Sequence, residues 1–228
     1  MPLQTRVPDT SVIGPVYYLH GFASSARSTK AMYFAERLRE CGLTLRIPDF
    51  NEPDFASLTM TRMLEQLNDD IARTPSPSDG SIVLVGSSLG AVVAVLTAAR
   101  MPERIWRLVL LAPALTFPKS ARFLGSERVS QWRATGTLEV FHFGDGVPRL
   151  LNYSFYEDSL KYDAFSVLFE QPTLVFQGLR DEALDYRDVE RYAADKPNIK
   201  LSLLDDDHQL TSSLPRIWSG TASFLGLT

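Results

Sequence analysis

The sequence predicts an α/β fold: a three-layer α/β/α sandwich around a mostly parallel sheet of about six strands. Three observations predict it. Short β-rich runs alternate with segments of helical periodicity along most of the chain. The run Ile82 to Val85 is apolar throughout, as expected for a strand that is buried on both faces of a parallel sheet. Leu89 to Ala99 has almost no polar face, so we expect it to form a central helix.

The amino-terminal part of the chain supplies two strands and a helix. Residues 16–19 form a short β-rich run, and residues 43–47 form a second strand that Pro48 halts. Between them, residues 30–41 are expected to form a helix that ends at Gly42. Its apolar side chains recur at helical spacing: Ala31, Phe34, Leu38 and Cys41.

The alternation continues to residue 111. An amphipathic helix is expected over residues 57–73, with one apolar face made by Met60, Met63, Leu64, Leu67 and Ile71. Thr74 to Gly80 is rich in turn-forming residues. We interpret it as a surface loop rather than a domain linker, because the same pattern continues on both sides. A strand over Leu108 to Leu111 follows the central helix.

A long insert, Phe117 to Glu170, then separates two strands and exceeds the length of a usual crossover. Thr137–Phe143 and Val147–Tyr153 flank the turn Gly144-Asp145-Gly146, which predicts a β-hairpin. Tyr156 to Phe169 is expected to be helical. We interpret the insert as a small cap over the carboxyl edge of the sheet, within one domain that spans residues 1–228.

Two strands and a helix complete the fold. The strands are expected over Thr173–Phe176 and Ile199–Leu204. The last helix begins after Ser212-Ser213 and has Pro215 in its first turn, which is a favoured position for proline. Its inner stripe consists of Leu214, Ile217, Trp218, Thr221 and Leu225.

Composition excludes several classes of protein. The chain has 228 residues, 45% of them hydrophobic, which suffices for one well-packed domain. Its net charge of -4 argues against a dedicated nucleic-acid or anionic-membrane surface. Cys41 is the single cysteine, so no intrachain disulfide forms. Neither a transmembrane span nor a secretory signal is recognised, so a cytoplasmic location is expected.

The segment Gly86-Ser87-Ser88-Leu89-Gly90 matches G-x-S-x-G. It follows an apolar strand and opens a helix, which is the context in which this motif forms a nucleophile elbow. The sharp turn strains the backbone of Ser88 and holds its hydroxyl above the sheet at a helix N-terminus. Ser88 is therefore the candidate nucleophile.

His20-Gly21-Phe22 closes the first strand, where the chain must bend over the nucleophile. The backbone N–H groups of Phe22 and Leu89 are the candidate oxyanion hole. His20 is expected to fix this loop rather than to transfer protons.

A serine hydroxyl needs a base, and the chain contains three histidines. His142 lies in the predicted hairpin, where we expect it to pack or to face solvent. His208 lies between the last strand and the last helix and is the candidate general base.

The base needs a carboxylate that fixes its tautomer. Asp181 follows the strand Thr173–Phe176, at the edge where parallel sheets place catalytic groups. The order Ser88, Asp181, His208 is the one that this architecture uses. Asp207 and Asp185 remain alternative acids.

Two further groups of residues admit competing interpretations. Asp205-Asp206-Asp207-His208 has the composition of a metal site, but successive residues in an extended segment point in different directions. No metal or other cofactor is expected. Cys41 sits at a helix end on the apolar face, which favours a buried structural thiol over a nucleophile.

Together these motifs resemble the α/β-hydrolase superfamily, from Tyr17 to Phe224. The chain looks most like the small, single-domain intracellular serine esterases and thioesterases, which share an H-G-F-x-S-S opening, a V-G-S-S-L-G elbow and a short cap. Mitochondrial acyl-glucuronide esterases, protein depalmitoylases and small bacterial esterases have a similar layout. Larger members carry two extra strands at the amino terminus. Only Met1 to Pro15 precedes the first strand here, so the sheet should be trimmed at that edge.

The sequence therefore predicts a serine hydrolase that acts on small-molecule esters or thioesters of small to medium acyl groups. An inactive binding protein, an acyltransferase and an aminopeptidase with the same triad remain alternatives. His20, Ser87 and Trp132 are candidate substrate-binding residues. At least one aromatic residue of the insert should face Ser88; the candidates are Phe117, Phe123, Trp132, Phe141, Phe143, Tyr153 and Phe155. The oligomeric state is left open.

Overall fold

The computed structural model describes residues 13–74, 81–119 and 124–227. Its centre is a six-stranded sheet in the order β2-β1-β3-β4-β7-β8, in which all neighbouring strands are parallel. The strands are β1 (Val16–Leu19), β2 (Leu45–Arg46), β3 (Ile82–Ser87), β4 (Ile105–Leu111), β7 (Thr173–Gly178) and β8 (Ile199–Leu204). The predicted three-layer α/β fold with about six strands is confirmed.

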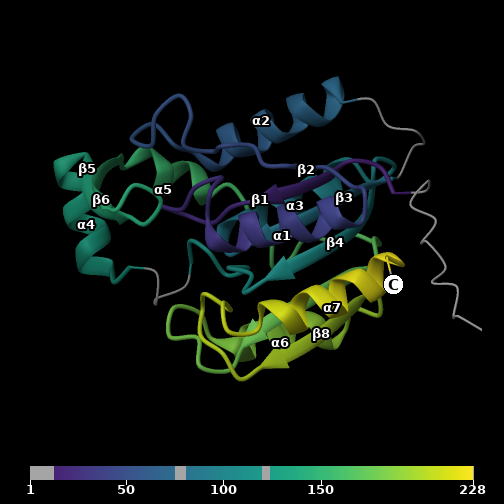
Figure 1. Ribbon diagram of the computed structural model, residues 1–228. Helices are drawn as coiled ribbons and strands as arrows, with labels where there is room; N and C mark the ends of the chain where they lie inside the picture. The colour runs from purple at the N-terminus through teal and green to yellow at the C-terminus, as the bar shows by residue number, and fades with distance from the viewer. Residues whose placement is uncertain (1–12, 75–80, 120–123, 228) are drawn as a thin grey trace, which may run out of the picture.

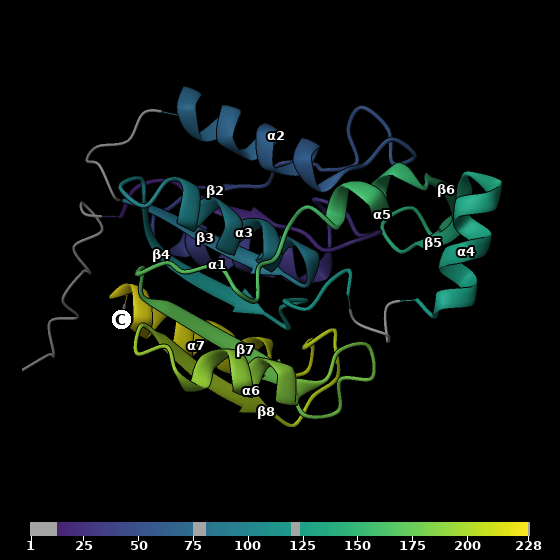
Figure 2. The same ribbon diagram turned by 180° about the vertical axis from the view of Figure 1, so that it is seen from behind.

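Helices cover both faces of this sheet (Figures 1 and 2). One face packs against α2, α3 and α6, and the other packs against α1 and α7. Their bounds are α1 (Thr29–Glu40), α2 (Met60–Arg73), α3 (Leu89–Arg100), α6 (Tyr186–Ala194) and α7 (Leu214–Leu225). The pattern follows from strand geometry, since alternate side chains point to opposite faces. Tyr17 and Leu19 thus enter the α2/α3 side, whereas Val16 and Tyr18 enter the α1/α7 side.

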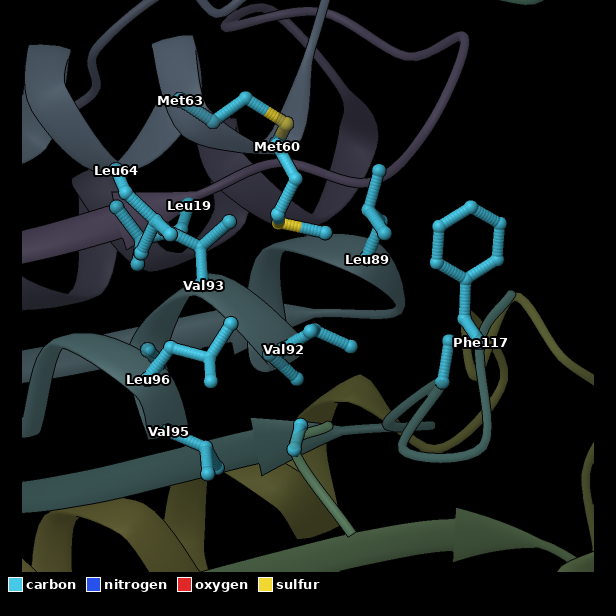
Figure 3. Close-up of a cluster of buried hydrophobic side chains, with 14 of the residues drawn as sticks. Leu19, Met60, Met63, Leu64, Leu89, Val92, Val93, Val95, Leu96 and Phe117 are labelled. Atoms are coloured by element: carbon cyan, nitrogen blue, oxygen red, sulfur yellow. The ribbon is translucent and has the colours of Figure 1, made fainter. Parts of the chain in front are cut away.

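The core on the α2/α3 side reaches the functional end of the sheet. Figure 3 shows Met60, Met63 and Leu64 of α2 packed against Leu19 and against a row of apolar side chains on α3. Leu89 lies at the start of that row, and Phe117 lies beside it. Residue 89 is thus both a core residue and a neighbour of the predicted nucleophile, so core packing fixes the start of α3.

The insert contains α4 (Ser126–Thr135), the hairpin strands β5 (Thr137–His142) and β6 (Val147–Asn152), and α5 (Ser154–Ser159). Figure 1 shows these elements beyond the ends of the strand arrows, at the carboxyl edge of the sheet. The hairpin forms as predicted, with Thr137 paired to Asn152 and His142 paired to Val147. We refer to the insert as the cap.

One expectation for the cap was wrong, and one of its helices was not predicted. The helix expected over 156–169 is the short α5, and the chain beyond it forms turns. Asp163 accepts the Ser166 N–H at 3.2 Å, and this side-chain turn competes with helix continuation. Helix α4 was not expected, because Trp132 is its one buried residue and no apolar stripe marks it.

Other differences are small. The helix expected from residue 57 begins at Met60, where the Thr59 hydroxyl accepts the N–H of Arg62 as an N-cap. Most of the expected loop over Thr74–Gly80 lies outside the described residues. Phe123 and all residues before Ile13 also lie outside them. Within the described residues, no helix is long and apolar enough to cross a bilayer.

Candidate active site

The turn between β3 and α3 has the geometry of a nucleophile elbow. Ser88 joins the two elements with φ 53° and ψ -113°, which is a strained conformation for a residue with a side chain. Its N–H donates to the carbonyl of Leu111 at 2.9 Å, and its carbonyl accepts the N–H of Ala91 at 3.1 Å. These backbone bonds hold the turn, so the Ser88 hydroxyl projects from the end of the sheet.

The two glycines of the motif are required by close backbone approach. A Cβ on Gly86 would lie 2.6 Å from the Cα of Ala91, inside the first turn of α3. A Cβ on Gly90 would overlap the carbonyl oxygen of Leu19, at the end of β1. The motif thus allows α3 to pass directly against the strand that leads into the predicted oxyanion loop.

Asp181 lies just beyond β7 and is surrounded by donors. Its Oδ1 accepts the backbone N–H groups of Ala183 at 2.9 Å and Leu184 at 2.8 Å. Its Oδ2 accepts Gln177 Nε2 at 2.9 Å and lies 2.8 Å from Nδ1 of His208. Burial raises the pKa of this carboxyl, but His208 and the other donors outweigh that effect, so the pKa lies below its usual value. Asp181 is therefore an ionised acceptor.

The loop after β8 places His208 between Asp181 and Ser88. Nε2 of His208 lies 3.2 Å from Oγ of Ser88. The Asp206 carboxylate shapes this loop, because it accepts the N–H of Asp207 at 2.9 Å and the N–H of Ser213 at 2.8 Å. The structure thus brings together the three predicted catalytic residues in one hydrogen-bonded chain, although they are 120 residues apart at the extremes.

A buried lysine, which no sequence pattern indicates, supports the same loop. Lys30 is only 8% exposed, and its ammonium group donates to the carbonyl of Gln209 at 2.8 Å. Burial lowers the pKa of Lys30 to about 8, although Asp207, Asp181 and Asp206 act in the opposite direction. Nothing in the spacing of Lys30 and Gln209, which are 179 residues apart, indicates this contact.

The predicted oxyanion donors lie at the same edge of the sheet. Phe22 and Leu89 line one cleft together with Ser88 and His208. Leu89 opens α3, so its N–H is among the first four of the helix, which have no partner within the helix. A Cβ on Gly21 would come within 3.2 Å of the Ser87 carbonyl and of the Ser88 Cβ, so the loop passes directly over the elbow.

His20 fixes this loop, as expected, and does not line the cleft. Its Nε2 accepts the N–H of Phe50 at 3.0 Å, so the proton of the neutral ring is on Nδ1, which donates to the carbonyl of Gly21 at 3.0 Å. This arrangement makes His20 a link between the β1–α1 loop and the segment after β2, and the placement does not support its proposed contact with substrate.

The cleft has a volume of about 1320 Å³. Its apolar lining near the serine includes Phe22, Leu89, Ala114, Phe117 and Leu184, and the cap adds Phe143, Pro148 and Leu150. Ser87, a candidate substrate-binding residue from the sequence, also lines it. Trp132 does not, and this expectation is corrected: its indole is buried beneath the hairpin and donates to the carbonyl of Leu151 at 3.0 Å.

The carboxylates that compete with Asp181, or that resemble a metal site in the sequence, bind other partners. Asp185 accepts the N–H of Arg187 as the N-cap of α6. Asp205 pairs with Arg180, and Asp207 accepts the N–H of Gln209, so these carboxylates do not converge. Among the described residues, no group of three His, Cys, Asp or Glu side chains could hold a metal ion.

Cys41 is half-buried rather than buried. Burial and Glu40 both raise the pKa of its thiol, which disfavours the nucleophilic thiolate.

The parallel sheet, the helices on both of its faces and the elbow at its carboxyl edge define a protein with the α/β-hydrolase fold. The chain belongs to the Uncharacterised protein family (UPF0227), whose model matches residues 16–223. No curated protein sequence matches it significantly.

Solved structures share the fold at low identity. Est1E from Butyrivibrio proteoclasticus with bound ferulic acid is 21% identical, with a TM-score of 0.78, over 99% of this chain and 91% of that one. Mouse alpha/beta hydrolase domain-containing protein 10 is 18% identical, with a TM-score of 0.77, over 94% and 90% of the two chains. A structure from work on LipS and LipT, two metagenome-derived lipolytic enzymes, is 17% identical, with a TM-score of 0.71, over 93% and 94%.

Proposed function

We propose that this protein is a serine hydrolase that cleaves carboxylic esters or thioesters of small to medium acyl groups. One observation carries the proposal: the hydrogen-bonded chain Ser88–His208–Asp181 opens into a cleft whose lining combines apolar side chains with polar and charged ones. A serine hydroxyl bonded to an imidazole, which is in turn held by a buried carboxylate, is the arrangement that activates serine as a nucleophile.

The chemistry follows from the geometry. Oγ of Ser88 attacks the acyl carbon while Nε2 of His208 takes the hydroxyl proton. The N–H groups of Phe22 and Leu89 stabilise the oxyanion. Collapse of the intermediate breaks the bond to the alcohol or thiol, which takes the proton from His208. A water molecule then gives a proton to His208 and attacks the acyl-enzyme; as the bond to Oγ breaks and the acid leaves, His208 returns that proton to Oγ of Ser88. Asp181 stays ionised and keeps the proton of the neutral ring on Nδ1.

The decisive experiment compares wild type with Ser88→Ala on p-nitrophenyl esters of increasing chain length, with a thioester alongside. Because ferulic acid is bound to Est1E, a ferulate ester belongs in the panel. Ser88→Ala should abolish turnover and labelling by a fluorophosphonate while leaving the unfolding transition unchanged. Ser130→Ala, which removes an exposed hydroxyl on α4, is the matched control. Turnover by Ser88→Ala above a few per cent of wild type would remove Ser88 from the nucleophile role.

A further inference from the structure

The tip of the cap hairpin, residues 142–146, is bonded to the β1–α1 loop, residues 20–28. The N–H groups of Phe143 and Gly144 both donate to the carbonyl of Ala23, at 2.7 Å and 3.4 Å. Ala23 directly follows Phe22, whose N–H is the proposed oxyanion donor. The cap therefore touches the catalytic machinery through the main chain and not only through the cleft lining.

A second set of hydrogen bonds runs through two side chains. The N–H of Asp145 donates to Nδ1 of His142 at 3.1 Å. Nδ1 is therefore an acceptor, and the ring proton is on Nε2, which donates to Oδ1 of Asn51 at 3.2 Å. Nδ2 of Asn51 donates to the carbonyl of Ser24 at 2.9 Å. This relay joins the hairpin tip, the segment after β2 and the β1–α1 loop.

The relay requires a neutral His142. The side chain is buried, and the ring of Phe55 packs edge-on against it with centroids 4.8 Å apart. Burial lowers the pKa of His142, and Arg149 and His20 act in the same direction, whereas Asp145 and Asp49 oppose them. A proton on Nδ1 would face the N–H of Asp145 at 3.1 Å, which is closer than the carboxylate oxygen Oδ2 of the same residue at 3.4 Å, so the neutral ring is the form that fits this hydrogen bond.

The bonds from the cap end at a strained point of the loop. Ala23 has φ 51°, a left-handed conformation that is strained for a residue with a side chain. Such a conformation persists only where its surroundings hold it. Here the carbonyl of Ala23 is held by Phe143 and the carbonyl of Ser24 by Asn51. The bend that orients the Phe22 N–H is thus fixed from outside the loop.

We propose that the hairpin tip is a latch for the oxyanion loop. His142, Gly144 and Asn51 are positioning residues: they hold the bend at Ala23, and through it the Phe22 N–H, in the geometry that stabilises the oxyanion. Docking of the cap and catalytic competence are therefore coupled. This inference rests on the proposed function. Because an oxyanion donor acts in the transition state, loosening the latch lowers kcat and leaves the KM for a short ester nearly unchanged.

Gly144 offers a way to open the latch. A Cβ at this position would lie 2.7 Å from the Cβ of Ser25 and 3.0 Å from its Oγ. Gly144 does not have a positive φ, so alanine fits its backbone; its Cβ clashes with Ser25 of the loop and also comes within 3.1 Å of Cε1 of His142. Gly125, also in the cap, has nothing within 4 Å, so Gly125→Ala is the matched control. Ser25→Gly removes the two closest atoms, leaves only the approach to Cε1 of His142, and should rescue Gly144→Ala.

The experiment measures kcat and KM with p-nitrophenyl acetate, and hydrogen exchange of the Ser24 amide, which donates to the carbonyl of Gly21 at 3.3 Å. Removing one oxyanion donor costs about 10²–10³ in rate. For Gly144→Ala, which displaces the donor, we expect kcat to fall about 10–100-fold, with KM within about threefold of wild type and faster exchange at Ser24. Gly144→Ala combined with Ser25→Gly should recover both values, and Gly125→Ala should resemble wild type.

A second variant tests the relay without touching a residue of the cleft lining. His142→Phe keeps an aromatic ring against Phe55 and removes both hydrogen bonds, so it should also lower kcat and speed exchange at Ser24. If Gly144→Ala does not fold, this variant decides. Faster exchange at Ser24 with an unchanged kcat, or unchanged exchange in His142→Phe, would overturn the proposal.

Failure of the proposed function would look different. Wild type would then neither hydrolyse any ester of the panel nor react with a fluorophosphonate at Ser88. In that case the coupling between hairpin tip and loop is decided by the exchange rates of Ser24 alone, since they do not depend on turnover.

Discussion

At the residue scale, Asp181 shows how an environment selects one side chain. All four of its hydrogen bonds come from donors: two backbone N–H groups, the amide of Gln177 and Nδ1 of His208. Only a carboxylate, which accepts at both oxygens, satisfies all of them. An amide must turn its NH₂ group toward two donors in either orientation.

Asp181→Asn should therefore lower kcat by several orders of magnitude, comparable to the roughly 10⁴-fold loss when a triad carboxylate becomes an amide. If the amide oxygen keeps the bonds from Ala183 and Leu184, its NH₂ faces Nδ1 of His208 and forces the proton onto Nε2. That nitrogen then cannot accept the proton of Ser88. The measurement is kcat on an activated ester for Asp181→Asn, Asp185→Asn and Asp207→Asn. A larger loss of kcat in Asp185→Asn or Asp207→Asn than in Asp181→Asn would assign the role of the triad carboxylate to that residue instead.

The sequence could predict these residues because each one follows the end of a strand. Parallel strands bring their carboxyl ends to one edge, so Ser88, Asp181 and His208 converge without knowledge of side-chain packing. Lys30 and Asn51 were not predictable in this way. Their roles depend on contacts among loops, and neither the residue type nor the local spacing marks such contacts.

At the element scale, the join between α3 and β1 depends on the absence of a side chain. Gly90→Ala would place a Cβ 2.7 Å from the carbonyl oxygen of His20, besides its overlap with Leu19. Both obstacles are backbone atoms, one at the end of β1 and one directly after it, which cannot rotate away. We expect a loss of about 3 kcal/mol or more in the free energy of unfolding.

Urea unfolding of Gly90→Ala and Gly125→Ala checks this prediction. Gly125 is the N-cap of α4 with open space around it, so alanine there should cost less than about 1 kcal/mol. Gly90→Ala with a stability equal to that of Gly125→Ala would show that α3 can shift, and that the close approach is not required.

The cap is the element that sequence periodicity described least well. Hairpin strands were predictable, since alternation and the Gly144-Asp145-Gly146 turn are local signals. Helix α4 is held by Trp132 alone and is otherwise polar, so it carries no periodic signal. The segment after α5, in contrast to α4, is rich in apolar residues. Its apolar residues Tyr162, Phe165, Val167 and Phe169 pack on the core from a chain of turns rather than from one helical face.

The cap should also set the preference for acyl groups. Leu150 lines the cleft from β6 and is otherwise exposed, so Leu150→Ala widens the cleft without opening the core. Acyl chains that reach it should lose up to about 10-fold in kcat/KM relative to acetate, since a buried methylene is worth about 0.8 kcal/mol. Leu168→Ala removes the same atoms at an exposed site outside the cleft and is the control. Identical chain-length profiles for the two variants would show that Leu150 of the cap does not determine the preference for acyl groups.

At the scale of the whole molecule, buried titratable groups link stability to pH. Lys30 has a pKa of about 8 in the folded protein against 10.5 for an ordinary lysine. Between these values the unfolded chain binds more protons than the folded one, so the free energy of unfolding rises with pH. Burial raises the pKa of Tyr18 and Tyr192, and this acts in the opposite direction above pH 10, where unfolded tyrosines ionise. The effect of Lys30 is therefore measured over about pH 8–9.5, below the titration of the tyrosines, where the raised pKa of Cys41 acts in the opposite direction.

Across that window Lys30 should add about 1–2 kcal/mol to the stability of the wild type, because one proton changes the free energy by up to about 1.4 kcal/mol per pH unit. Urea unfolding at pH 8, 8.75 and 9.5 measures the slope. Lys30→Met removes the titrating group and should flatten it, whereas Lys200→Met, at an exposed position, should retain it. A slope that survives in Lys30→Met would assign the linkage to another group. If the slope does disappear, burial of the Lys30 ammonium lowers the free energy of unfolding at neutral pH. The same burial allows the hydrogen bond from Lys30 to the carbonyl of Gln209, next to His208.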